Sequence, residues 1–259
     1  MLFKDLIDPI SEEEFVSEYK GKKPFVSRGN KVRKKFFSDI ISWKKFSEYI
    51  SNDRAVSGLQ AIVPAEPMAL KLCMEKPGPN YLKPEGSKFW RREDYWFDAK
   101  RLQTLWYDND TSIILTKAGK LTPNINSICG GFEKGYESIV KAGCAADAHF
   151  YCSQNKGAHS FECHADGLDN FIIHSIGKVH WKVYPIFTNG KKNIMTEEEE
   201  SKHEPFIDEV LSEGDVLYLP KGIFHRAHSI GPRISISVQV AENQGAIDRN
   251  WYDFTPKFA

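Results

Sequence analysis

Three residues combine types and spacing that could hold a metal ion: His164, Asp166 and His225. His164 and Asp166 lie two positions apart, so on a strand or at its end both side chains point to the same face. His225 closes the stretch GDVLYLPKGIFH, in which two glycines and a proline favour turns on either side of a short strand. Two imidazoles and one carboxylate on one face are the ligand set of mononuclear non-haem Fe(II). We therefore predict an Fe(II) site formed by these three residues.

The remaining histidines and the cysteines fit this site less well. His228 lies three residues beyond His225, so on the same strand it would face the opposite way. A zinc site that used Cys163 or Cys152 would need further soft ligands at regular spacing, which the sequence lacks. Two more histidines of this region are predicted to lie outside the ligand set, namely His174 and His180.

The elements that must position these residues begin near Ala146, where short segments of β-branched and aromatic residues take over. Five such segments are AHFYCS, NFIIHSI, VHWKVYPIF, DVLYL and RISISVQV, separated by Gly, Pro, Asn and charged residues. This texture predicts an antiparallel barrel or sandwich. We predict an α+β protein, with residues 1–145 mainly helical, a double-stranded β-helix barrel over 146–243 and a tail over 244–259. Residues 1–259 are expected to form a single domain.

Helical spacing and turn-forming residues predict the elements of the N-terminal portion. Ser11 followed by Glu14 is typical of a helix start. Trp43, Phe46 and Ile50 recur at intervals of three and four, as on one face of a helix. The pattern predicts helices over residues 11–19, 42–50, 93–107 and 124–142, a short strand over 24–26 and a long loop over 74–95.

Three stretches carry a family resemblance. GDVLYLPKGIFH matches the second motif of the cupin superfamily, and HADGLDNFIIHSIGKVHWKVY resembles an iron-binding strand and its hairpin, down to Gly177 and Trp181. FVSEYKGKKPFVSRG resembles the opening helix and strand of the same proteins. Together they make the chain similar to the JmjC and ribosomal-oxygenase-like branch of Fe(II)/2-oxoglutarate oxygenases. The resemblance implies a cupin or jelly-roll barrel and oxidative decarboxylation of 2-oxoglutarate coupled to hydroxylation, or to demethylation through hydroxylation.

A 2-oxoglutarate oxygenase needs a cation for the far carboxylate of its cosubstrate, because that charge is buried. Members of this branch place Lys or Arg two residues after the glycine that matches Gly177, where this chain has Val179. Lys178 and Lys182 have the wrong strand parity to replace it. That one of these two lysines anchors 2-oxoglutarate is kept as an alternative.

The motif Arg233-x-Ser235 resembles the clamp of the other large branch, and we predict that it binds 2-oxoglutarate. The alternative is that Arg233 is a solvated residue after the Gly231–Pro232 turn. Asn170 and Tyr151 resemble positions that contact the cosubstrate in this family, and Ser160 is a weaker candidate.

Composition narrows the class of protein further. Lys+Arg and Asp+Glu both number 35, so no net charge draws the chain to nucleic acid or to a membrane. Its 5 cysteines are odd in number and show no CxxC pairing, which favours a reducing compartment. No basic, apolar leader and no long apolar run is present, so a cytoplasmic location is expected. A homodimer stays open.

The substrate and two rival functions stay open at this point. Analogy with the family favours a protein side chain, and a small metabolite is the alternative. The segment 88–97, rich in aromatic and basic residues, could border a substrate cleft or pack on the barrel. A cupin enzyme that does not use 2-oxoglutarate is favoured by Val179. A catalytically silent binding module is opposed by the intact ligand set.

Overall fold

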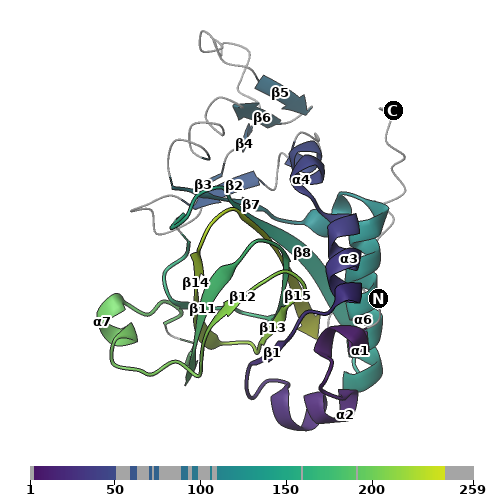
Figure 1. Cartoon of the computed structure of the whole chain (residues 1–259), viewed down its shortest axis with the longest axis vertical. Coiled ribbons are helices and arrows are strands. Elements are labelled where there is room, and N and C mark those ends of the chain that lie inside the picture. Colours follow the sequence, from purple (N-terminus) through teal and green to yellow (C-terminus); the bar gives the residue numbers. More distant parts are fainter. Residues whose placement is uncertain are drawn as a thin grey trace.

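A computed structural model of the chain describes residues 3–50, 59–62, 70–71, 73–75, 89–92, 95–98, 106, 110–158, 160–190 and 192–242. At its centre the strands curve into a barrel, with helices gathered on one side (Figure 1). An eight-stranded sheet has the order β1-β13-β10-β15-β8-β7-β2-β3, a four-stranded sheet the order β12-β11-β14-β9, and a three-stranded sheet the order β4-β6-β5. The recorded strand pairs are antiparallel.

Five of the barrel strands, β8, β10, β11, β13 and β15, correspond to the predicted segments, and the predicted fold class is confirmed. The barrel strands are β8 (Cys144–Ser153), β9 (His164–Ala165), β10 (Asp169–Ile176), β11 (Val179–Phe187), β12 (Ile207–Leu211), β13 (Val216–Leu219), β14 (Ile223–Ser229) and β15 (Arg233–Glu242). Successive side chains of a strand point to opposite faces. On β10, Phe171 and Ile173 therefore join the core beneath the helices, whereas Ile172 joins a second core between the two large sheets. The larger sheet is thus buried on both faces.

The helices cover the outer face of the larger sheet. They are α1 (Phe3–Ile7), α2 (Glu12–Glu14), a π-helical turn (Phe15–Tyr19), α3 (Lys31–Ile40), α4 (Trp43–Ile50) and α6 (Pro123–Val140), with β1 (Phe25–Ser27) between the second and third of these α-helices. The Ser11 hydroxyl accepts a hydrogen bond from the Glu14 amide, and Thr122 caps α6 in the same way. The helices predicted over 42–50 and 124–142, and the helical segment predicted over 11–19, are confirmed.

The prediction of a helix over residues 93–107 is wrong at Tyr95–Asp98, whereas Trp106 is helical. Tyr95–Asp98 forms β6, which pairs with β5 (Phe89–Arg92) and β4 (Cys73–Glu75). Aromatic residues favour strands, and here that preference outweighs the helical spacing. The loop predicted over 74–95 likewise contains strand residues. Apart from these strand residues and Trp106, both ranges lie outside the described residues.

Several elements were not predicted. Besides α1, α3 and β12, they are β2 (Leu59–Ile62), β3 (Leu70–Lys71), β7 (Ser112–Leu115), a 3-10 turn (Ala118–Lys120) and α7 (Glu197–Glu200). Among the described residues, no helix has the length and apolar character needed to cross a membrane.

Candidate metal centre

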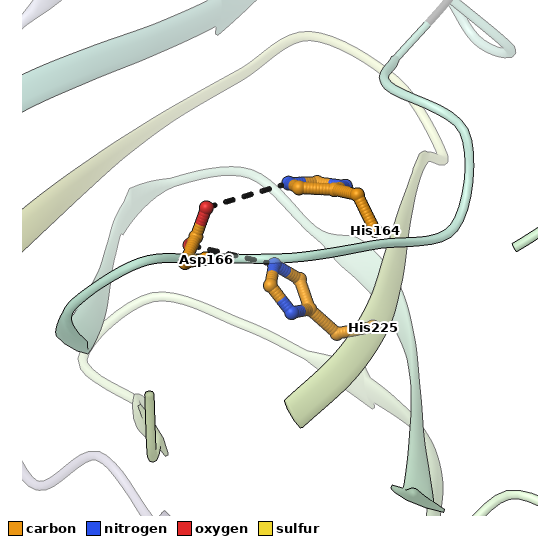
Figure 2. Close-up of side chains that lie close together, drawn as sticks. All are labelled: His164, Asp166 and His225. Atoms are coloured by element: carbon orange, nitrogen blue, oxygen red, sulfur yellow. Dashed lines mark ion pairs between the residues drawn. The ribbon is translucent and has the colours of Figure 1, made fainter. Parts of the chain in front are cut away.

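His164, Asp166 and His225 converge at one end of the barrel. His164 on β9 is the register partner of His225 on β14, and Asp166 follows β9 directly. His164 Nε2 lies 3.7 Å from Asp166 Oδ1, and His225 Nε2 lies 3.6 Å from Asp166 Oδ2. Figure 2 shows both imidazoles turned toward the carboxylate between them. The three ligand atoms lie within 4.8 Å of one another, so one ion could contact all of them.

Hydrogen bonds to the backbone prepare both imidazoles for a metal. His164 Nδ1 lies 2.8 Å from the Glu162 carbonyl oxygen, and His225 Nδ1 lies 3.0 Å from that of Ile223. A carbonyl only accepts, so each Nδ1 carries the proton and each Nε2 presents a lone pair. Burial lowers the pKa of His225 to about 4, which favours the neutral ring that metals bind.

Asp166 is kept ionised and oriented. Burial alone would raise its pKa, but the two histidines and a hydrogen bond from Asn170 together lower it. Asn170 Nδ2 donates to Asp166 Oδ2 over 3.0 Å, and Asn170 Oδ1 accepts from Ser237 Oγ over 2.7 Å. These two bonds fix which way the Asn170 amide points. The neutral nitrogens and the ionised carboxylate suit a divalent ion such as Fe(II), and the described residues contain no second group of this kind.

A turn glycine links the two ligand segments. Gly222 has a φ of +83°, a conformation that other residues rarely adopt. Its amide donates to the Asp166 carbonyl over 2.9 Å, and the neighbouring Lys221 amide donates to Asp169 Oδ1 over 2.7 Å. The turn that precedes His225 is therefore bonded to the turn that follows His164.

The cluster opens into a pocket with about 490 Å³ of empty space, part of which is open solvent. Every residue predicted to contact metal or cosubstrate lines it. The lining residues are Ile62, Tyr151, Ser160, Phe161, His164, Asp166, Asn170, Ile172, Trp181, His225, Ala227, Arg233 and Ser235.

Arg233 is a buried cation in this pocket, with 3% of its surface exposed. Its Nε donates to the hydroxyls of Ser153 and Ser229, each over 3.1 Å, and its Nη1 lies 3.4 Å from Ser235 Oγ. Among the described residues, no carboxylate forms an ion pair with it, and burial lowers its pKa to about 10. Ser153 and Ser229 hold the Nε side, and Ser235 accepts one hydrogen of Nη1. Among the contacts of the described residues, this leaves the other Nη1 hydrogen and Nη2 for a ligand. Arg233 is thus not the solvated residue of the alternative interpretation.

The lysines considered as anchors do not reach the pocket. Val179 is fully buried in the apolar core between the sheets, Lys178 is exposed, and Lys182 is partly exposed and absent from the pocket lining. His180 pairs instead with Asp208 over 2.5 Å, outside the metal cluster.

Five apolar or aromatic lining residues were not predicted from the sequence to line the site: Ile62, Phe161, Ile172, Trp181 and Ala227. Strand parity could have indicated Ile172, because it lies two residues after Asn170 on β10. Ile62 belongs to a strand that was not predicted, so no sequence pattern pointed to it.

Comparison with known proteins adds the family. The family described as JmjC domain matches residues 133–246, which include the three clustered residues and Arg233. Over these residues the chain is similar to the JmjC domain family, and its curated relatives include ribosomal oxygenases. Ribosomal oxygenase 1 of Danio rerio is 22% identical over 249 residues, covering 94% of this chain and 40% of that protein.

A second curated relative and a solved structure show the same similarity to ribosomal oxygenases and related hydroxylases. The bifunctional lysine-specific demethylase and histidyl-hydroxylase NO66 of Dictyostelium discoideum is 26% identical over 265 residues, covering 97% of this chain and 44% of that protein. The chain thus spans less than half the length of these curated relatives. The structure of YcfD, a ribosomal oxygenase from Escherichia coli in complex with cobalt and 2-oxoglutarate, shares the fold with a TM-score of 0.53 at 17% identity. That match covers 90% of this chain and 52% of YcfD.

Proposed function

We propose that this protein is an Fe(II)- and 2-oxoglutarate-dependent oxygenase that hydroxylates a C–H bond of its substrate. The observation that carries the proposal is the buried Arg233, which has no ion pair with a described carboxylate and lies in the same pocket as His164, Asp166 and His225. A buried cation is costly unless an anion accompanies it. A dicarboxylate that reaches from the metal cluster to Arg233 would supply that anion.

Each described residue then has a task. His164, Asp166 and His225 would hold Fe(II), and Asn170 orients the carboxylate among them. Arg233 and Ser235 would bind the far carboxylate of the cosubstrate, with Tyr151 beside them on the neighbouring strand. When bound, Fe(II) supplies dioxygen activation coupled to oxidation of 2-oxoglutarate to succinate and CO2. Ile172 and Trp181 form an apolar wall that limits access of water.

For the substrate we propose a protein side chain. The support is the relatives, one of which is named as a lysine demethylase and histidyl-hydroxylase. Hydroxylation of a carbon and demethylation through hydroxylation require the same positioning of a C–H bond at the metal, so the site accommodates either outcome.

Anaerobic titration with Fe(II) and then with 2-oxoglutarate tests the proposal. We expect the metal-to-ligand absorption of a chelated 2-oxoglutarate, followed by succinate release when air is admitted. Asp166→Ala should abolish both, because one of three ligands is lost. Metal binding without that absorption and without succinate would favour a cupin enzyme that does not use 2-oxoglutarate. No metal binding at all would favour a silent binding module.

A further inference from the structure

His174 lies on the barrel wall behind the pocket and is fully buried. It is the register partner of Ser235 across strands β10 and β15. Both of its ring nitrogens have partners: Nε2 lies 3.0 Å from Trp181 Nε1, and Nδ1 lies 3.3 Å from Ser235 Oγ. Trp181 and Ser235 both line the pocket, so His174 connects two parts of its wall.

The chemistry of the indole fixes the direction of this chain of hydrogen bonds. An indole N–H only donates, so His174 Nε2 accepts the bond from Trp181 and carries no proton. The neutral ring therefore has its proton on Nδ1 and donates it to Ser235 Oγ. Burial, together with the positive charge of Arg233, lowers the pKa of His174 to about 3, so the ring is neutral at physiological pH.

Ser235 receives a second bond from the opposite side. Arg233 Nη1 donates to the same Oγ over 3.4 Å. A hydroxyl oxygen accepts two hydrogen bonds and donates one. With both acceptor positions taken by His174 and Arg233, the Ser235 proton is free to be donated only toward the pocket that the side chain lines.

We propose that Trp181 and His174 are positioning residues that hold the Ser235 hydroxyl as a hydrogen-bond donor to the carboxylate bound beside Arg233. A carboxylate only accepts hydrogen bonds, so it needs this orientation of the hydroxyl. With the opposite tautomer, His174 Nδ1 would accept the Ser235 proton, and a lone pair would face the anion instead. The inference rests on the proposed function, because it concerns the anion that the oxygenase would bind.

A double-mutant cycle tests whether His174 acts through Ser235. The quantity to measure is the Kd for 2-oxoglutarate of the Co(II)-loaded protein, alongside the Kd for Co(II). His174→Leu removes the donor and should weaken 2-oxoglutarate binding roughly tenfold, the effect of one hydrogen bond to a charged group. His174→Asn can still donate from near the Nδ1 position and should restore most of the affinity. His174→Leu combined with Ser235→Ala should bind no more weakly than Ser235→Ala alone.

His180→Asn is the matched control, because His180 lies on the neighbouring strand and pairs with Asp208 outside the pocket lining. It should leave the Kd for 2-oxoglutarate unchanged. Additive losses in the cycle would overturn the inference, since they would mean that His174 contributes only packing. Wild-type protein that binds Co(II) but not 2-oxoglutarate would instead overturn the proposed function.

The tautomer itself can be measured without metal or cosubstrate. In metal-free protein with 15N-labelled histidine, NMR should show His174 protonated at Nδ1 and unprotonated at Nε2. Trp181→Phe keeps an aromatic ring but removes the indole donor, so part of the population should move to the other tautomer. A wild-type His174 protonated at Nε2 would refute the inference whatever the affinities are.

Discussion

Arg233 holds a positive charge inside the barrel, and that placement costs free energy until an anion joins it. Its serine partners satisfy the Nε hydrogen but contribute no negative charge. The residue therefore lowers the stability of the empty protein while it raises affinity for an anionic ligand. Function and stability should respond to its removal in opposite directions.

We expect Arg233→Met to weaken 2-oxoglutarate binding by about 2–5 kcal/mol, because a buried charge pair with the cosubstrate is lost. The melting temperature of the ligand-free protein should stay level or rise, because Ser153 keeps hydrogen bonds to Ser112 and Ser229. Titration calorimetry and thermal denaturation measure the two effects. Lys178→Met, at an exposed position, should change neither. Weaker binding in Lys178→Met or Lys182→Met, with Arg233→Met unaffected, would mean that a lysine anchors the cosubstrate.

At the scale of elements, the turn that connects β10 and β11 packs against the start of β15. Gly177 has a φ of +75°, and a Cβ there would lie 2.1 Å from the Pro232 carbonyl oxygen and 3.1 Å from Arg233 Cα. Backbone atoms cannot move aside cheaply, so a side chain at this turn displaces the strand that holds the clamp.

Gly177→Ala should therefore destabilise the protein and also weaken 2-oxoglutarate binding. Gly190→Ala is the matched control, because Gly190 has a φ of +79° but a Cβ there would meet no atom within 4 Å. The control should be destabilised only by the cost of a left-handed backbone conformation, about 1–2 kcal/mol, and its affinity for 2-oxoglutarate should not change. Chemical denaturation and a 2-oxoglutarate titration of both variants give the comparison. Equal losses of stability and of affinity in Gly177→Ala and Gly190→Ala would show that the contact with β15 is unimportant.

Helix α7 is attached to strand β14, which carries His225, through a buried carboxylate. Glu200 Oε1 accepts from the Tyr184 hydroxyl over 2.7 Å, and Oε2 accepts from Arg226 Nη1 over 2.9 Å. Arg226 is the neighbour of His225 on β14. Burial opposes ionisation of Glu200, but these two bonds outweigh it and lower its pKa from the ordinary value of 4.5.

A carboxyl group whose pKa is lower in the folded than in the unfolded state stabilises the fold at any pH above its unfolded-state pKa. That stabilisation is lost as the pH falls through its folded-state pKa. Glu200→Gln should therefore cost about 1.5–3 kcal/mol at pH 7. The difference in free energy of unfolding between the variant and the wild type should become smaller as the pH falls below 4.5. Urea denaturation across pH measures it. Glu198→Gln, which removes an exposed partner of Lys202, should cost under about 1 kcal/mol. A difference for Glu200→Gln that grows on acidification would contradict the assignment.

Whether the sequence predicts a strand depends on how many of its residues are buried and in what pattern. β10, β13 and β15 alternate or carry continuous apolar runs, so their patterns suffice. β12 is buried only at Ile207 and Leu211, with three exposed residues between, and no local pattern reveals such a strand. The clustering of His164, Asp166 and His225 followed from their spacing, because two strand ends and a turn motif position them. The link from Trp181 through His174 to Ser235 depends on register between distant strands, which sequence spacing does not give.

At the scale of the whole molecule, the N-terminal helices and the barrel share one core. Phe3 of α1 packs edge-on against Phe15, Phe132, Tyr136 and Phe171, with ring centroids 5.5 to 6.0 Å apart. Phe171 lies on β10, the strand that also carries Asn170 and His174. The expectation of a single domain over residues 1–259 becomes, for the described residues, the proposal that helices and barrel unfold together.

Phe3→Ala tests that proposal, because it removes a ring that is 2% exposed from the junction of helix and barrel. Large-to-small substitutions of buried aromatic residues cost about 3–5 kcal/mol. We expect the far-UV circular dichroism of the helices and the cobalt absorption of the barrel to be lost in one transition at a lower denaturant concentration. Val32→Ala, at a side chain that is 73% exposed, should change stability by less than about 0.5 kcal/mol. Loss of the helical signal in Phe3→Ala while the barrel still binds cobalt would show two units that unfold separately, and would contradict the proposal.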